Sequence, residues 1–339
     1  MGSVGEDTYG VVRFTVPDTS VSSQDRAIFT LPGNKSIHDT SVKLHDFSAP
    51  QTRALNDVLS GPDGLDNQGF TYIKHKSSLD YDHFLTGSNV EDVYVPELES
   101  LVKEVTGCRK VVVYCVAFRR RLATEQGIQK VEMKGGEIDR FVGCLPRDRI
   151  LVSGRDAYST EPSRQFESAD KYGVYISPDG LFETLKSCRR DITDAAKPVL
   201  EAAEHGSAIP RYGAFSVWRP LKTVQRDPIV VCDSRTNDRN ELAPVDFRAL
   251  SEMKESAEYS MQALMGLPPR YPEKQKWYWI PNQTPEDVLF IKFSDSAAGS
   301  ISTDGTPIAL GCMHTSAIVP GTEDLEVRES VEARVYAFW

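Results

Sequence analysis

Histidine is the commonest metal ligand among protein side chains and a frequent acid–base catalyst, and the sequence contains six histidines. Three of them stand beside an aspartate, in the pairs His38–Asp39, His45–Asp46 and Asp82–His83. Adjacent side chains of a strand point to opposite faces of the sheet, so none of these pairs could hold one ion. His75 and His205 have no acidic residue at the spacing of metal ligands.

The sixth histidine, His314, lies in a strand-like segment, Gly311–Ala317. A lone histidine on a strand is most simply a hydrogen-bonded core residue. Cys312, two residues earlier, would face the same side of a strand and could act as a soft metal ligand, which is the less favoured interpretation. The residues alone therefore do not decide whether His314 is a core residue or a metal ligand.

The six cysteines are scattered, form no C-x-x-C pair and mostly lie within apolar segments, so we expect free thiols in a reducing cytosol, with disulfides as the alternative. The formal net charge of −10 disfavours nucleic acid and an anionic membrane as partners. No apolar segment approaches the roughly 18 residues of a membrane span, and the N-terminal residues lack the features of a signal peptide. We therefore expect a cytoplasmic globular protein.

The elements that must position these side chains are mostly strands. Alternating and short apolar segments predict strands over residues 11–16, 41–47, 69–73, 110–118, 215–219, 229–232, 259–265, 276–280, 288–293, 308–313 and 331–338. A short helix is expected from Ser48 to about Gly61, and another from Pro96 to the glycine cap Gly107. A long amphipathic helix is expected over 179–203, and residues 237–258 are expected to form loop and helix.

The domain organisation follows from composition. Residues 1–35 are polar and contain one short strand, so we expect an extended N-terminal arm suited to packing on a neighbouring chain. Residues 36–339 contain no linker, repeat or low-complexity segment and are expected to form one domain. Several short strands late in the chain, preceded by helices, predict a mainly β fold with flanking helices and a jelly-roll core.

The stretch Phe215–Arg235 contains V-W-R-P-L followed by R-D-P-I-V-V-C-D-S-R, and it resembles the signature of a fungal and bacterial oxygenase family. That family includes gibberellin-desaturase-like, AsaB-like and CmcJ-like hydroxylase/desaturases. Further similar segments are L-D-N-Q-G-F at 65–70, W-Y-W at 277–279, T-P-E-D-V-L-F-I-K-F-S-D-S at 284–296 and R-E-S-V-E-A-R at 328–334. The resemblance implies an iron(II)/2-oxoglutarate-dependent oxygenase on a double-stranded β-helix (cupin-like) core.

The resemblance also implies an iron site made of an early H-x-D motif and a late histidine. His314, in G-C-M-H-T-S-A, matches the late histidine. The early motif should fall at Leu151–Thr160, which contains no histidine.

Two alignments of that segment with the H-x-D motif are possible, and they differ in how many metal ligands are missing. In one, Asp156 is the carboxylate and Gly154 replaces the histidine; in the other, Arg155 and Ala157 occupy both ligand positions. In both, the fixed positive charge of Arg155 lies at or beside the metal position. His314 and Asp156 are therefore expected to be vestigial ligands that hold iron weakly or not at all.

Arg328, fourteen residues after His314, stands where such oxygenases often place the arginine that binds the 2-oxoglutarate carboxylate. Arg334 and Arg219 are the substitutes for this role. For each of the three arginines, a salt bridge within the sheet is the alternative. Trp218, like the tryptophans of W-Y-W, is expected to be a core or pocket-wall residue.

Three hypotheses follow from the resemblance and the missing histidine. In the first, which we favour, the chain binds no cofactor tightly and supports a catalytic iron(II)/2-oxoglutarate-dependent paralogue as a heterodimer. The small-molecule substrate of that complex would be a fungal secondary metabolite, terpenoid or polyketide-derived. In the second, the chain is itself an active hydroxylase/desaturase with a rearranged ligand set. In the third, it is a metal-free isomerase, cyclase or binding protein, for instance with Tyr158 or Asp156 as acid and base.

Overall fold

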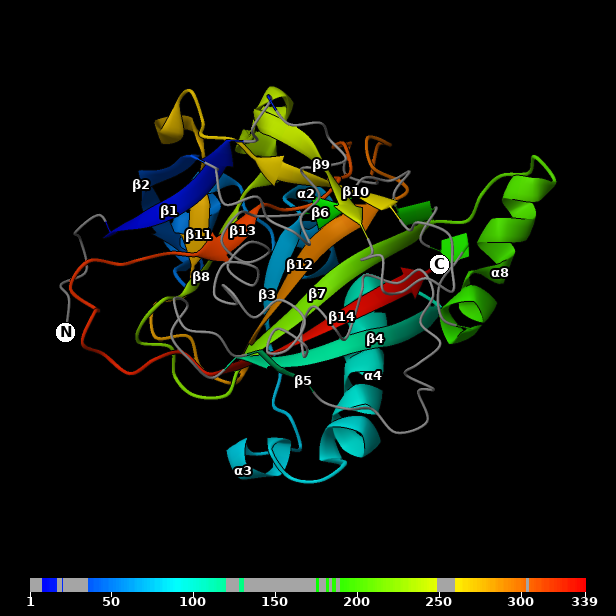
Figure 1. The fold of residues 1–339 in the computed structure, drawn as a ribbon, viewed down its shortest axis with the longest axis horizontal. Coiled ribbons are helices and arrows are strands. Elements are labelled where there is room, and N and C mark those ends of the chain that lie inside the picture. Colours follow the sequence, from blue (N-terminus) through cyan, green and yellow to red (C-terminus); the bar gives the residue numbers. More distant parts are fainter. Residues whose placement is uncertain are drawn as a thin grey trace.

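Two β-sheets face each other and form the body of the protein (Figure 1). The structure is a computed structural model that describes residues 8–16, 20, 36–119, 128–130, 175–176, 181–182, 185–186, 190–248, 260–302 and 305–339. The larger sheet has six strands in the order β3 (Phe70–Lys74), β12 (Asp287–Asp295), β7 (Tyr212–Pro220), β14 (Ser330–Phe338), β4 (Lys110–Arg119) and β5 (Ile128–Lys130). The smaller sheet has five, in the order β1 (Thr8–Val16), β2 (Ser36–Asp46), β11 (Trp277–Trp279), β8 (Ile229–Cys232) and β13 (His314–Ser316).

Shorter elements surround the two sheets. A third sheet contains β6 (Tyr175–Ile176), β10 (Ser260–Gly266) and β9 (Leu242–Arg248). The helices are α1 (Pro50–Asn56), α2 (Gly61–Asn67), α3 (Tyr81–Phe84), α4 (Val95–Thr106) and α8 (Arg190–Glu204), with a π-helical turn, η2 (Val90–Tyr94). Three 3₁₀ turns complete the set: η5 (Ser234–Thr236), η6 (Arg239–Glu241) and η7 (Pro272–Lys274). Every helix within the described ranges is too short or too polar to span a bilayer.

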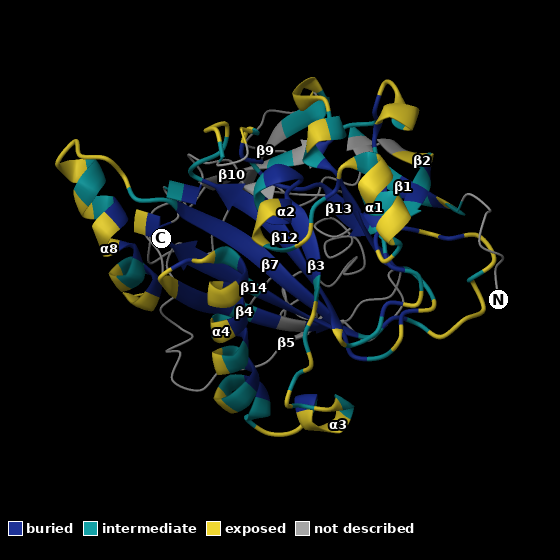
Figure 2. Ribbon diagram, turned by 180° about the vertical axis from the view of Figure 1, so that it is seen from behind, coloured by how far each residue is buried: buried dark blue, intermediate teal, exposed yellow. Residues whose placement is uncertain are grey.

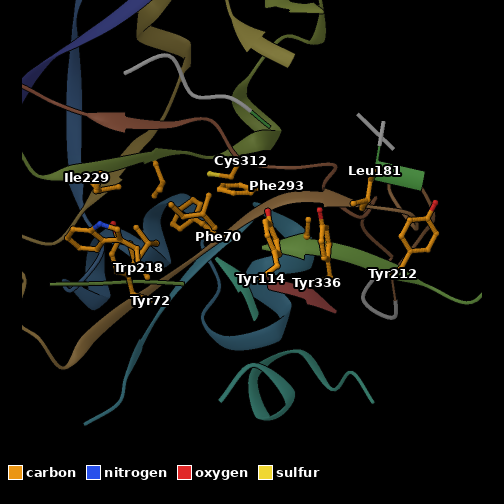
Figure 3. Close-up of a cluster of buried hydrophobic side chains, with 14 of the residues drawn as sticks. Phe70, Tyr72, Tyr114, Leu181, Tyr212, Trp218, Ile229, Phe293, Cys312 and Tyr336 are labelled. Carbon is orange, nitrogen blue, oxygen red and sulfur yellow. The ribbon is translucent and has the colours of Figure 1, made fainter. Parts of the chain in front are cut away.

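The larger sheet is buried on both faces, as Figure 2 shows for β7, β12 and β14. Its outer face packs on α4, whose Leu98, Leu101 and Val102 are buried against Val217 and other apolar residues of the sheet. Its inner face and the facing side of the smaller sheet share one apolar cluster, here called the interior cluster, drawn in part in Figure 3. Helix α8 packs Ile192, Ala196 and Val199 against the same cluster. Two sheets that enclose a common interior are the architecture of the expected jelly roll.

Most of the predicted elements are confirmed. The continuous apolar runs became β4, β7, β8, β12 and β14, the expected strands at 41–47, 69–73, 259–265 and 276–280 are β2, β3, β10 and β11, and Gly107, at φ 69°, ends α4. The strand expected within the N-terminal arm is β1, which pairs along its whole length with β2. Most other residues of 1–35 lie outside the described residues, so the arm's role stays a prediction. Of the long helix expected over 179–203, α8 covers 190–204.

Two predictions were wrong. Residues 242–248 form strand β9 rather than loop or helix, because pairing with β10 overrides the local charge pattern. Residues 308–313 are irregular, and the strand begins at His314. The backbone N–H groups of this apolar segment bond elsewhere: Ala309 N donates to Asp66 O (2.7 Å) and Cys312 N to Lys292 O (2.9 Å).

A buried ion cluster joins α2, β12 and the start of β7. The ammonium of Lys292, fully buried, lies 2.7 Å from Asp295 Oδ2 and 3.0 Å from Asp66 Oδ1. Arg211 binds both carboxylates through its guanidinium. Although burial acts in the opposite direction, the hydrogen bonds from Arg211 and the charge of Lys292 lower the pKa of Asp66. Two cations and two anions in mutual contact satisfy one another, so the cluster is stable only when complete.

Replacing Lys292 tests the cluster's role in stability. Lys292→Met leaves two buried carboxylates with one cation, and we expect the free energy of unfolding to fall by about 3–5 kcal/mol in urea denaturation. Lys197→Met is the matched control, because the ammonium of Lys197 is exposed and pairs only with Glu201, 3.6 Å away. That control should change stability by about 0.5 kcal/mol or less. Equal losses in the two variants would contradict the account.

Candidate metal and co-substrate site

His314 opens β13 and is held there by the preceding segment. The amide of Cys232 donates to Met313 O (2.8 Å), and β13 then pairs with β8 so that His314 lies opposite Val231. Gly69, at φ 87°, lets this segment approach closely, since a Cβ at that position would lie 2.8 Å from Gly311 O. The L-D-N-Q-G-F motif thus positions the strand that carries His314.

The imidazole of His314 is buried and oriented. Its Nδ1 lies 3.0 Å from Cys312 O, and a carbonyl oxygen can only accept, so Nδ1 carries the proton and Nε2 the lone pair. Its ring stacks on Phe293, with centroids 5.4 Å apart and planes 16° apart. Phe293 lies where β12 shifts register against β7, and its side chain faces the interior, as do those of Leu289 and Ile291. This is the orientation that a metal-binding histidine requires.

Arg328 reaches the same strand from the loop before β14. Its Nη1 donates to Asp227 O (2.5 Å) and to Ser316 Oγ (3.1 Å), and its guanidinium lies 5.6 Å from the ring centroid of Trp218. Burial lowers the pKa of Arg328 to about 10, with the charges of Asp227 and Glu332 acting in the opposite direction, so it is charged at neutral pH. Within the described ranges, its hydrogen bonds go to a backbone carbonyl and a hydroxyl and none to a carboxylate. A buried guanidinium with only neutral acceptors is suited to bind the carboxylate of a ligand.

A second charged group lies on the inner face of β14. Glu332 accepts hydrogen bonds from Ser216 Oγ (3.0 Å) and Arg334 Nε (3.1 Å). Although burial opposes it, the Glu332 carboxylate raises the pKa of Arg334 above its ordinary value. Arg334 is therefore already paired with a carboxylate within its own strand, which leaves Arg328 as the better candidate for an anionic ligand.

The neighbouring interior surface is aromatic. Tyr114 and Tyr336 stack with ring centroids 4.4 Å apart. Figure 3 shows their hydroxyl oxygens turned toward the side on which Phe293 and Cys312 lie. Burial raises the pKa of the Cys312 thiol well above its ordinary value, so without a metal Cys312 is a protonated thiol.

His45 shares a face with His314 but cannot share a metal ion with it. In the smaller sheet His45 pairs with Tyr278, Tyr278 with Val231, and Val231 with His314. Three strand spacings of about 4.8 Å put the two histidines about 14 Å apart. The rings of His45 and Tyr278 also pack together, with centroids 5.4 Å apart.

The other four histidines lie elsewhere. His75 binds Arg219 on the outer side of the larger sheet, Nδ1 to Nη2 at 2.7 Å, and His83 pairs with Asp80 at the surface. His38 and His205 are exposed. Arg219 also donates to His75 O and Pro285 O, so it faces away from His314 and does not substitute for Arg328. In the part of the chain that the structure describes, no group of three or more His, Cys, Asp or Glu residues could hold a metal ion.

The segment expected to carry the early motif, Leu151–Thr160, lies outside the described residues. Asp156 and the residues of both alternative alignments belong to this segment. The structure thus brings Arg328 to β13, where it binds Ser316, two residues after His314, and the role of Asp156 stays a prediction. The sequence analysis missed the ion pair of Glu332 with Arg334, although residues two apart on a strand share a face and the E-x-R spacing could have indicated it.

Comparison with known proteins identifies the chain. A family model described as "Oxidoreductase/YMDC permease-like domain" matches residues 23–136 and 183–338. The gibberellin cluster GA4 desaturase of Gibberella fujikuroi is 30% identical over 297 residues, 81% of this chain and 82% of that one. The alpha-ketoglutarate-dependent dioxygenase tstK of Talaromyces stipitatus is 24% identical over 309 residues, 91% of this chain and 88% of that one. The chain belongs to the iron(II)/2-oxoglutarate-dependent hydroxylase/desaturase family of fungal secondary metabolism.

A solved structure confirms the fold. The iron and alpha-ketoglutarate-dependent endoperoxidase NvfI superimposes with a TM-score of 0.59 at 21% identity, over 98% of this chain and 98% of that one. The two facing sheets described above are therefore the double-stranded β-helix core expected from the sequence.

The described residues alone do not provide the ligand set of the family's metal. Iron in such a site takes two histidines and one carboxylate on one face. All six histidines lie within the described residues, and none of the other five is near His314. Any further ligand from outside those residues would have to be something other than histidine.

An iron-binding measurement tests this conclusion. The purified chain, incubated with iron(II) and 2-oxoglutarate without oxygen and then desalted, should retain well below one iron per chain, because one imidazole cannot make a facial site. His314→Ala should leave that value unchanged, as should the surface control His205→Ala. Stoichiometric binding at micromolar iron that His314→Ala alone abolishes would contradict the account and favour an active enzyme with a rearranged ligand set.

Proposed function

We propose that this chain is an oxygenase-family subunit with an incomplete iron site that supports a catalytic iron(II)/2-oxoglutarate-dependent paralogue as a heterodimer. The complex would act on a small-molecule intermediate of fungal secondary metabolism, a terpenoid or a polyketide-derived compound. Iron and 2-oxoglutarate would be bound by the catalytic partner.

The observation that carries the proposal is the isolation of His314 from every other histidine. The five others are either exposed, paired on the outer face of the larger sheet, or about 14 Å away along the smaller sheet. Leu151–Thr160 also carries Arg155 where a dication should bind. A retained fold with a lost metal site is what a supporting subunit requires.

The two chains of the heterodimer need a large contact surface. We propose that this surface consists of the N-terminal arm, residues 1–35, and the outer β surface. A permanent complex buries well over about 1,000 Å². Strand β1 is the outermost strand of the smaller sheet, bridged at Val11 to Ile318, and Tyr9 on it is 49% exposed. An edge strand with an exposed aromatic side chain is suited to a protein contact.

The charged interior supports a second candidate, a metal-free enzyme or binding protein. Glu332 is a buried carboxylate that accepts a hydrogen bond from Ser216 Oγ. Arg328 is a buried cation whose hydrogen bonds to described residues all go to neutral oxygens. Such groups could bind a substrate and move a proton without a metal. Activity of the isolated, iron-free chain would favour this candidate over the first.

Removing the histidine from one chain of the mixed complex at a time tests the subunit role. We expect His314→Ala in this chain to leave turnover within a few-fold of wild type, since no metal depends on that imidazole. Removing the matching histidine of the catalytic partner should abolish turnover, because a facial ligand is lost. Tyr9→Asp, at an exposed position of β1, should lower activity by separating the two chains, which size-exclusion chromatography would detect.

The outcome that contradicts the proposal is equally specific. If His314→Ala abolishes turnover while the fold and the assembly stay intact, this chain performs its own chemistry. If no paralogue forms a complex with this chain, the subunit role is wrong.

A further inference from the structure

Among the described residues, the buried polar atoms of the interior that have no hydrogen-bond partner include the phenol oxygens of Tyr72 and Tyr278 and the indole nitrogen of Trp218. Tyr72 is 6% exposed and Trp218 3%. Buried donors are satisfied in most proteins, and each one left unpaired costs about 1–3 kcal/mol.

Two of these donors lie in one row of the larger sheet. Leu289 of β12 pairs with Tyr72 of β3 on one side and with Trp218 of β7 on the other. All three side chains therefore point to the same face, which is the interior, and Figure 3 draws Tyr72 and Trp218 in the same part of the cluster. Both donors therefore face the same side of the sheet, on the two strands that flank β12.

The surroundings of this pair are apolar. Phe47 packs on Tyr72 with ring centroids 4.9 Å apart, and Phe70 lies 6.3 Å from the same ring. Burial raises the pKa of Tyr72 well above its ordinary value, so its hydroxyl stays protonated and can donate. The indole N–H of Trp218 can only donate. Two donors in an aromatic environment are complementary to an apolar molecule with an oxygen acceptor.

We propose that Tyr72 and Trp218 form a binding site for a small molecule with a carbonyl-type oxygen on an apolar skeleton. The oxygen accepts from both donors, and the skeleton packs on the aromatic side chains around Tyr72. This site adjoins Arg328, whose guanidinium covers the Trp218 ring, but it uses neutral donors rather than that charge. The proposal does not depend on the subunit role, because it concerns the isolated, iron-free chain.

A pair of isosteric probes tests the site. 4-Fluoroacetophenone carries a carbonyl oxygen where 4-fluoro-α-methylstyrene carries a methylene group, and fluorine NMR titration gives the Kd of each. We expect the ketone to bind the wild-type chain more tightly, and Tyr72→Phe to reduce its advantage about fivefold, the value of one hydrogen bond near 1 kcal/mol. Trp218→Phe should reduce the advantage similarly, while Tyr94→Phe, on the opposite side of the sheet, should leave it unchanged.

Thermal unfolding without ligand separates a binding role from a structural one. Tyr72→Phe removes a hydroxyl that has no partner, so its Tm should not fall. In the control Tyr94→Phe, a hydroxyl that accepts from Arg219 Nε at 3.3 Å is lost, and Tm should fall by about 2 °C or more.

Two results would overturn the proposal. Equal affinity of both probes for the wild-type chain would show that the donors do not select an oxygen acceptor. A fall in Tm for Tyr72→Phe as large as that of the control would show that the hydroxyl is already satisfied, for instance by ordered water.

Discussion

The buried ammonium of Lys292 is the constraint on which the arrangement of the two sheets depends. Its side chain joins Asp66 and Asp295, and its backbone bonds to Gly69 and Cys312, so one residue links α2, β3, β12 and the segment that leads to His314. The motifs shared with the oxygenase family converge here. Asp66, Lys292 and Asp295 are explained by their mutual ion pairs, and Gly69 by the close approach of Gly311. These contacts stabilise the fold and involve no metal.

The described part of the interior has kept features that orient ligands. His314 Nδ1 is fixed by Cys312 O, and the guanidinium of Arg328, from the loop before β14, binds Ser316, two residues after His314 on β13. Among the described residues, no group of side chains completes a metal site with His314. This arrangement supports the proposed subunit role, in which the catalytic partner binds the iron.

Sequence reasoning succeeded where burial dominates and failed where tertiary pairing decides. The apolar runs of β4, β7 and β14 are buried on both faces and could be recognised without a structure. Strand β9 could not, since its charged residues are strand only because β10 pairs with them. The resemblance in the sequence identified His314 and Arg328. The hydrogen bond from Arg328 to Ser316, near His314, and the separation of His45 from His314 depend on tertiary structure and strand register, which no local pattern encodes.

The proposed subunit role requires that this chain does not assemble a facial iron site. The most direct measurement is anomalous diffraction at the iron absorption edge, from crystals grown with iron(II) and 2-oxoglutarate in the absence of oxygen. The account predicts no ordered iron peak next to the imidazole of His314. A fully occupied peak about 2.1 Å from His314 Nε2, completed by ligands of this same chain, would contradict it.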